Sequence, residues 1–383
     1  MKRLVIATDS FKGSLSSREV AEAFKEGFRR YSPNCDIQIV DIADGGEGTM
    51  RTLIEALNGE IVEIEVNDPL HRPIKAHYGI IERGNTAIIE MAEASGLTLL
   101  KVEERNPMLT STYGTGEIIA DAIRRGCRKF LIGIGGSATN DAGVGLLQAL
   151  GFRFLDCNGN ELLGGGAILE SIASIDDSNV CNPLCECEFI VACDVKNPLY
   201  GNNGAAYIFA PQKGASRTMV EVLDGGLRNF ARVVEKFNGS QIATIEGAGA
   251  AGGVGGGVVA LLNAKLVRGI DMVLEATNFE DIIHGCNLVI TGEGRIDRQT
   301  LMGKAPSGVL RLASAQNIPT IAIGGCIEWC EELRNSSFAA IEVVTPEGMT
   351  IEEAMKPATA KDNIRHTAER ISQKFQKIGV VQH

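Results

Sequence analysis

The sequence predicts an α/β protein of two domains, in which a doubly wound parallel-sheet domain is interrupted by a second, mixed α/β domain. The chain has 383 residues, which at roughly 150 residues per domain corresponds to two or three domains. Short apolar runs typical of buried strands alternate with amphipathic helical patterns at both ends of the chain. Glycine is abundant, at 45 residues, and clusters where the predicted strands end.

The N-terminal region shows the strand–loop–helix order of a parallel sheet twice. A buried-strand pattern at 4–7 is followed by a polar loop and by a helix that begins with a capping box of Ser16 and Glu19. The same order recurs with a strand at 37–42 and a helix at 50–57. Because parallel strands need such crossover helices, this order predicts a doubly wound sheet.

The middle of the chain departs from this order. Residues 61–105 alternate polar and apolar positions between turns, which predicts antiparallel hairpins. The strands predicted for the doubly wound sheet are 4–7, 37–42, 129–134, 287–290, 320–323 and 339–344. We therefore assign 1–60, 106–150 and 283–383 to the doubly wound domain, and 61–105 and 151–282 to the inserted domain.

Composition excludes several classes of function. The net charge of −11 argues against nucleic acid as a partner, because phosphate backbones attract basic surfaces. No window is apolar over the 18 or so residues that a membrane span requires, so no membrane partner is expected. The N-terminal segment reaches Asp9 too early for a signal peptide, and a cytoplasmic protein is expected.

Polar loops, most of them containing glycine, follow five predicted strands, one of which is predicted at 188–192. They are DSFKGS at 9–14, DGGEGT at 44–49, GGSATND at 135–141, CDVKNP at 193–198 and TGEGRID at 291–297. Ligands of open α/β sheets bind beyond the carboxyl ends of the strands. The carboxylates in these loops are Asp9, Asp44, Glu47, Asp141, Asp194, Glu293 and Asp297, and the cations that we single out are Lys12, Arg295 and the nearby Lys304.

This set of side chains is suited to phosphoryl transfer. The reaction needs donors around the phosphoryl group, carboxylates for Mg²⁺, and a carboxylate to accept the proton of the acceptor hydroxyl. A Ser-His-Asp hydrolase is not indicated, because none of the five loops contains histidine. A Walker A loop is also absent, because Gly303-Lys304 is followed by Ala305.

Other interpretations remain open at the level of sequence. The segment Gly133–Ala138 matches GxGxxA after a strand, with Asp156 about twenty residues on, as in an NAD(P)-dependent hydroxy-acid dehydrogenase. A non-catalytic sensor of small anions would also need cationic loops. Asp141 is a candidate N-cap as well as a candidate metal ligand. The glycine-rich run 247–257 suits either a phosphate cradle or close helix packing.

Several long motifs resemble the bacterial glycerate kinases of the type I family, which are similar to glycerate 2-kinases. The resemblance rests on DSFKGSLSS at 9–17, DGGEGT at 44–49, GIGGSATNDAG at 133–143, CDVKNPLYG at 193–201, GAGAAGGVGGG at 247–257 and TGEGRIDRQTLMGKAP at 291–306. It implies transfer of the γ-phosphate of ATP to D-glycerate with Mg²⁺, giving 2-phosphoglycerate in preference to 3-phosphoglycerate. It also implies a flavodoxin- or Rossmann-like domain and an inserted domain, with the active site in the cleft between them. A homodimer is a further possibility.

The resemblance and the loop chemistry together predict roles for individual residues. We expect Asp194 to be the general base, Lys12 to contact phosphate oxygens, and Arg295 to bind the glycerate carboxylate bidentately. Asp141 and Asp297 are the predicted Mg²⁺ ligands, and both are also rivals of Asp194 as the base. The predicted substrate- and phosphate-binding residues are Ser10, Gly13, Ser14, Gly45, Gly46, Gly135, Gly136, Ser137, Asn197, Glu293 and Lys304.

Overall fold

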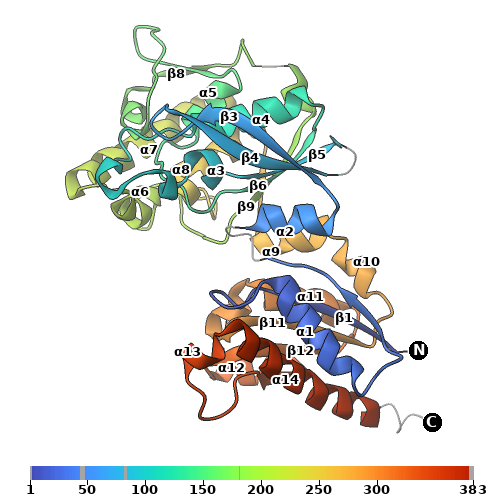
Figure 1. The fold of residues 1–383 in the computed structure, drawn as a ribbon. Helices are drawn as coiled ribbons and strands as arrows, with labels where there is room; N and C mark the ends of the chain where they lie inside the picture. The colour runs from blue at the N-terminus through green and yellow to red at the C-terminus, as the bar shows by residue number, and fades with distance from the viewer. Residues whose placement is uncertain (1, 44–47, 82–83, 181, 379–383) are drawn as a thin grey trace. The chain divides into compact units, whose positions relative to one another are not determined.

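The computed structural model describes residues 2–43, 48–81, 84–180 and 182–378. The chain forms two compact units, each built from its own sheet and helices (Figure 1). Unit 1 consists of Met1–Asp44 and Val273–His383, and unit 2 consists of Gly45–Met272. Each unit combines a sheet with helices, so the predicted α/β class is confirmed.

Unit 1 contains a five-stranded sheet in the order β13-β12-β11-β1-β2, and every neighbouring pair is parallel. Its strands are β1 (Arg3–Thr8), β2 (Asp36–Ile39), β11 (Leu288–Ile296), β12 (Thr320–Ile327) and β13 (Ala340–Val343). The apolar runs that predicted these strands are buried, as expected for a parallel sheet covered by helices.

Two long helices of unit 1, α1 (Ser17–Arg29) and α14 (Pro357–Ile378), pack side by side on one face of its sheet (Figure 1). They approach closely at Gly27, where an added Cβ would lie 2.2 Å from the carbonyl oxygen of Arg365. The predicted capping box of Ser16 and Glu19 is present at the start of α1. The shorter helices are α10 (Phe279–Ile283), η7 (Arg298–Met302), α11 (Ala305–Ala315), α12 (Glu331–Arg334) and α13 (Ile351–Ala354).

Unit 2 contains a six-stranded mixed sheet in the order β10-β9-β6-β5-β4-β3. Its strands are β3 (Glu60–Asn67), β4 (Pro73–Ile81), β5 (Thr86–Glu90), β6 (Lys129–Gly133), β9 (Glu188–Ala192) and β10 (Lys265–Val267). The first three are antiparallel neighbours, which confirms the predicted hairpins, and the last four are parallel. A separate two-stranded sheet pairs β7 (Arg153–Leu155) with β8 (Ser174–Asp176).

Helices surround the sheet of unit 2. They are α2 (Thr49–Ala56), α3 (Ala92–Ser95), η2 (Leu97–Leu99), η3 (Val102–Glu104), α4 (Tyr113–Arg124), α5 (Val144–Ala149), η4 (Gly166–Ser171), η5 (Asn182–Glu186), α6 (Ala205–Phe209), η6 (Pro211–Lys213), α7 (Arg217–Asn238) and α8 (Ala250–Leu262). Helix α9 (Gly269–Ala276) follows β10 and leads into unit 1. Among the described residues, every helix is too short or too polar to cross a bilayer.

The structure corrects the predicted assignment of the strand at 129–134. This segment is β6, which pairs with β5 and β9 of unit 2 and not with any strand of unit 1. Phe130 on β6 stacks on Phe189 of β9, with ring centroids 4.8 Å apart. The prediction failed because an apolar run indicates that a strand is buried but does not indicate its neighbours. As a consequence, residues 106–150 belong to unit 2, which is one continuous segment that also takes in 45–60, whereas 273–282 belong to unit 1.

Candidate functional site

The sheet of unit 1 has a topological switch point between β1 and β11. From β1 the chain passes through α1 to β2, which lies toward one edge of the sheet. From β11 it passes through α11 to β12, which lies toward the opposite edge. Because both crossovers are right-handed in nearly all proteins, α1 and α11 lie on opposite faces, which leaves a crevice beyond the carboxyl ends of β1 and β11.

A cavity of about 420 Å³ lies in unit 1, lined by the loops that follow these two strands. Its polar wall is formed by Asp9, Ser10, Lys12, Ser14, Glu293, Arg295, Asp297 and Lys304. The structure therefore brings together the predicted residues of the 9–14 and 291–304 segments. Gly13 belongs to the same turn, with φ of +78°, a conformation that favours glycine.

Three buried hydroxyl oxygens near this crevice have no hydrogen-bond partner among the described residues. They belong to Thr8 at the end of β1, Thr291 within β11, and Ser14 in the cavity wall. Buried hydroxyls are normally paired, so unpaired ones indicate a place where water or a ligand is bound. Their positions coincide with the switch point.

Glu293 and Lys304 form a partly buried ion pair in the cavity wall. Glu293 is 7% exposed, and its carboxylate accepts hydrogen bonds from Thr300 Oγ1 at 2.7 Å and from Lys304 Nζ at 3.2 Å. Burial raises the pKa of Glu293, while Thr300 and Lys304 act in the opposite direction. This pairing fixes the ammonium group of Lys304 at the start of α11.

Arg295 lies on the rim of the cavity, with its side chain 62% exposed. Its guanidinium is ion-paired with Glu328 and lies 3.6 Å from Asp297 Oδ2. The hydrogen bond that Arg295 donates to Glu328 raises the pKa of Arg295, so this group stays charged. Two carboxylates thus orient the guanidinium while leaving much of its surface open to a ligand.

Asp297 has a structural role in addition to lining the cavity. Its Oδ1 accepts a hydrogen bond from the backbone N–H of Gln299 at 2.8 Å, so it is the N-cap of η7. A capping carboxylate retains lone pairs for a second partner. Asp297 therefore combines a cap with an available position at the cavity, which the sequence pattern did not separate.

The other wall of the cavity is apolar and was not foreseen from the sequence. It includes Val344 after β13, Ile351 and Ala354 on α13, Met355, and Ala360 on α14. Ile351 is 72% exposed and Met355 is 40% exposed, so this wall presents apolar surface to solvent. These residues lie in a segment without glycine-rich loops, so no local pattern distinguished them.

In unit 2, the predicted Gly135–Ser137 turn lies at the carboxyl end of β6. Gly135 and Gly136 are exposed, and Gly136 has φ of +71°. The turn is held by backbone hydrogen bonds from Leu97 N to Gly136 O and from Ala138 N to Ser95 O. The structure thus confirms an exposed glycine turn at a strand end, within unit 2.

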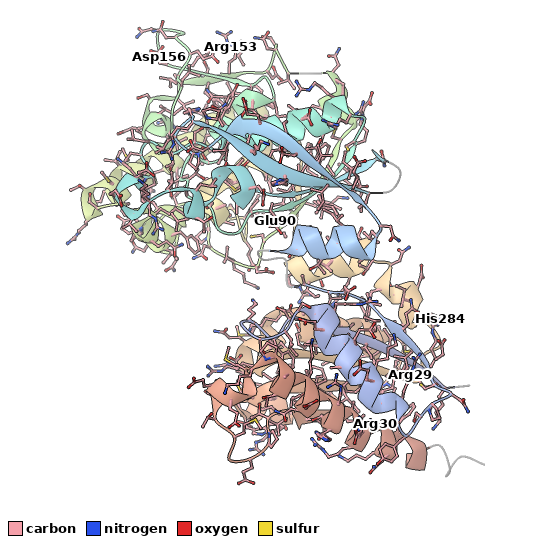
Figure 2. The ribbon with its side chains drawn as sticks, viewed as in Figure 1. Arg29, Arg30, Glu90, Arg153, Asp156 and His284 are labelled. Atoms are coloured by element: carbon pink, nitrogen blue, oxygen red, sulfur yellow. The ribbon has the colours of Figure 1, made fainter. Side chains whose placement is uncertain are left out.

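The dinucleotide-binding alternative for Gly133–Ala138 is wrong. Such a site needs a helix that starts directly at the glycine turn, but α5 begins only at Val144. Asp156 follows β7 of the two-stranded sheet, at the periphery of unit 2 (Figure 2). Its carboxylate accepts hydrogen bonds from the backbone N–H groups of Asn158 and Asn160, so it stabilises its own turn.

Asp141 is fully buried beneath the Gly135–Ser137 turn. Its Oδ2 accepts hydrogen bonds from Thr112 N and Thr112 Oγ1, both at 2.8 Å, and from Gly145 N, while Oδ1 accepts one from Gly143 N. Burial raises the pKa of Asp141, and these hydrogen bonds oppose the rise. Both oxygens are engaged within the protein, which favours the structural role over the predicted Mg²⁺ ligand.

A buried lysine accompanies this carboxylate and was missed by the sequence analysis. Lys213 is 2% exposed and its Nζ donates hydrogen bonds to Ser137 Oγ and to Thr139 O, both at 2.7 Å. Burial lowers the pKa of Lys213 to about 7, and the charge of Asp141 opposes this. Lys213 ends η6, far along the chain from the Gly135–Ser137 turn that it contacts, so its role depends on tertiary structure.

The glycine-rich run 247–257 is mostly a packing surface. A Cβ added at Gly252 would lie 2.1 Å from Thr139 O, and one added at Gly257 would lie 2.0 Å from Ala142 O. These glycines bring α8 against the segment that follows the Gly135–Ser137 turn. Their burial favours close packing over a phosphate cradle.

Asp194 follows β9 at the same edge of the sheet as the Gly135–Ser137 turn, because β6 and β9 are parallel neighbours. It is exposed, and its Oδ1 accepts a hydrogen bond from Gly269 N at 3.0 Å. Asn197 in the same loop donates to Asn203 O and so fixes the loop. Glu90, the last residue of β5, also lies at this edge (Figure 2), although no motif in the sequence marks it.

The predicted residues Gly45 and Gly46, with Asp44 and Glu47, lie outside the described residues. Within the described part of the chain, no group of three or more His, Cys, Asp or Glu side chains is arranged to hold a metal ion. Mg²⁺ usually needs only one or two carboxylates together with substrate phosphates. Asp9 and Asp297 in the cavity wall supply oxygen donors of that kind.

Comparisons with known proteins agree on one family. Residues 4–376 match the model of the glycerate kinase family. The chain is 47% identical to a glycerate kinase of Bacillus subtilis (93% of this chain, 94% of the relative) and 45% identical to a glycerate 2-kinase of Escherichia coli K12 (97% of each). A crystal structure from Salmonella typhimurium LT2, assigned as glycerate kinase 2, aligns with a TM-score of 0.89 at 42% identity, covering 99% of this chain and 100% of that one.

Proposed function

The chain belongs to the glycerate kinase family, and on that premise we propose that it transfers the γ-phosphoryl group of ATP to a hydroxyl group of D-glycerate. Such an enzyme is a phosphotransferase with an alcohol group as acceptor. The observation that supports this most directly is the cavity at the switch point of unit 1. It gathers three cations and three carboxylates from loops that are far apart in the sequence.

Lys12, Lys304 and Arg295 are the proposed anion-binding groups of this cavity. Lys12 and Lys304 lie in the polar wall and are suited to the phosphate oxygens of ATP. The planar guanidinium of Arg295 is suited to bidentate binding of the glycerate carboxylate. Ser10, Gly13 and Ser14 would add hydroxyl and backbone donors around the same anions. Phosphoryl transfer depends on this kind of positioning and charge stabilisation more than on covalent chemistry.

We assign the magnesium site to Asp297 and Asp9 in place of Asp141, because both oxygens of the Asp141 carboxylate already accept hydrogen bonds within the protein. When bound, Mg²⁺ supplies charge neutralisation of the phosphate oxygens. Glu293, with its raised pKa and its bond to Lys304, is suited to holding that lysine in place. These assignments belong to unit 1.

Asp194 remains our proposed general base, because it is an exposed carboxylate at a strand end. Gly135, Gly136, Ser137 and Asn197 lie at that same edge of unit 2 and are proposed to bind substrate. The predicted position of the active site in a cleft between two domains stays a prediction. The homodimer and the cytoplasmic location also stay predictions.

Product analysis tests the proposed function. The full chain is incubated with ATP, Mg²⁺ and D-glycerate, and the phosphorus and proton NMR spectra of the product are recorded. We expect 2-phosphoglycerate and an equal amount of ADP. Formation of 3-phosphoglycerate would correct the site of transfer, and ATP hydrolysis or ligand binding without any phosphoglycerate would exclude the kinase function.

A further inference from the structure

The cavity of unit 1 has two chemically different ends. The charged end contains Lys12, Arg295 and Lys304, and the apolar end contains Val344, Ile351, Ala354, Met355 and Ala360. Pockets that bind cofactors are mostly apolar, with a few polar groups that fix orientation. The two ends therefore indicate a ligand that is itself apolar at one end and anionic at the other.

The volume of the cavity also indicates a ligand larger than D-glycerate. Its volume of about 420 Å³ lies within the ~300–1,000 Å³ that is common for pockets of cofactor-sized ligands. D-glycerate is a three-carbon hydroxy acid without apolar surface, so it could neither fill this space nor benefit from the apolar end. The other proposed substrate, ATP, has a flat base with two apolar faces and a highly charged triphosphate.

A ligand bound at the apolar end would remove exposed apolar side chains from contact with water. The side chains of Ile351 and Met355 are 72% and 40% exposed, although both are large and apolar. Thr345 and Asn363 in the same wall offer polar atoms that could meet the edge of a base. Burying apolar side chains against a base is favourable, because apolar area is removed from water.

We propose that the apolar end of this cavity binds the adenine base of ATP, so that the triphosphate extends toward Lys12 and Lys304. This assignment rests on the proposed kinase function. It places the nucleotide in unit 1 alone, against a wall that includes Phe11, Ile351 and Met355. Gly13 lies so close to that wall that an added Cβ would be 2.9 Å from Met355 Cε.

The test compares two phenylalanine variants of the full chain. Ala354→Phe fills the apolar end, whereas Ala358→Phe places the same side chain at an exposed position of α14 outside the cavity wall. We expect Ala354→Phe to raise the KM for ATP about tenfold or more while the KM for D-glycerate changes less than about twofold, because a filled pocket removes binding of only one substrate. Ala358→Phe should leave both values unchanged.

A second pair of variants, with smaller changes, tests the assignment in case Ala354→Phe misfolds. Ile351→Ser is compared with Val102→Ser, because the two side chains are 72% and 73% exposed and only the first lines the cavity. Only Ile351→Ser should raise the KM for ATP, by about threefold, since a partly exposed contact is lost. Melting curves of each variant identify any loss of folding.

Equilibrium binding separates this inference from the proposed function. ATP and inorganic tripolyphosphate are titrated into the protein by calorimetry without D-glycerate, so no turnover is needed. We expect the wild type to bind ATP at least about tenfold more tightly than tripolyphosphate, and Ala354→Phe to lose this preference. Equal affinities in the wild type, or a rise in the KM for D-glycerate alone, would overturn the assignment even if phosphoglycerate is formed.

Discussion

The two units place their charged side chains in opposite environments. In unit 1, Lys304 and Arg295 are held by carboxylates at the wall of a cavity and remain partly exposed. In unit 2, Lys213 and Asp141 lie beneath an exposed glycine turn and are almost completely sealed from solvent. A ligand can reach the first set directly, whereas the second set can act only through the backbone and side chains that it holds.

This difference in exposure distinguishes charged groups that can bind a ligand from charged groups that stabilise the protein. Exposed cations around a cavity can exchange water for the oxygens of a ligand at little cost. Buried charges are already stabilised by internal hydrogen bonds, and they fix the conformation of the loop above them. Loops with the same glycine-rich style can therefore have different roles, which variants in each unit should distinguish.

The largest expected effect is the loss of the buried carboxylate. Asp141→Ala should lower the free energy of unfolding of unit 2 by about 3–5 kcal/mol, because four donors lose their acceptor and Lys213 loses a compensating charge. Hydrogen exchange of unit 2 peptides in urea measures it. Asp156→Ala, in an exposed turn, should cost less than about 1 kcal/mol. Similar costs for both variants would contradict the comparison.

The next effect concerns the exposed edge of unit 2. Asp194→Asn should lower kcat about a hundredfold or more, because the amide cannot accept the proton of the substrate hydroxyl. Its oxygen can still accept the hydrogen bond from Gly269 N, so stability should change little. Steady-state rates and a urea titration measure the two quantities. A decrease in kcat of less than about tenfold would show that Asp194 is not the base.

The buried lysine should make the stability of unit 2 depend on pH. Burial lowers the pKa of Lys213 from 10.5 to about 7 in the folded protein, so the unfolded chain binds more protons between these values. The free energy of unfolding should consequently rise with pH above about 7, by up to about 1.4 kcal/mol per pH unit.

Lys213→Met should abolish this rise, and the exposed Lys265→Met should preserve it. Hydrogen exchange of unit 2 at several pH values between about 7 and 9, corrected for the intrinsic exchange rates, follows the effect within the window set by the two pKa values. A wild-type protein whose unit 2 stability does not change with pH in this window would mean that Lys213 keeps its ordinary pKa.

The smallest expected effect tests the partly exposed carboxylate of unit 1. Asp297→Ala should lower the stability of unit 1 by about 1 kcal/mol, the usual cost of losing an N-cap. Asp297→Asn keeps an acceptor for Gln299 N and should cost a few tenths of that. The fluorescence of Trp329, the single tryptophan, reports on unit 1 in urea. A loss as large as that of Asp141→Ala would remove the distinction between the units.

Local patterns in the sequence determined much of this protein. The capping box at Ser16 and the hairpins at 61–105 follow from short-range chemistry, and the structure confirms them. The loops at 9–14 and 291–304 were recognised because glycines, cations and carboxylates after buried strands have few other uses. The family resemblance rested on the same short motifs.

Only the tertiary structure decided which of these groups face a ligand. The sequence could not place the strand at 129–133 in unit 2, because strand pairing depends on residues distant in the chain. It could not show that Asp141 is sealed while Asp194 is exposed, or that Lys213 lies under Ser137. Residue type fixes what a side chain can do, but its solvent exposure and neighbours, and hence its proton affinity and its access to a ligand, arise only when distant segments pack together.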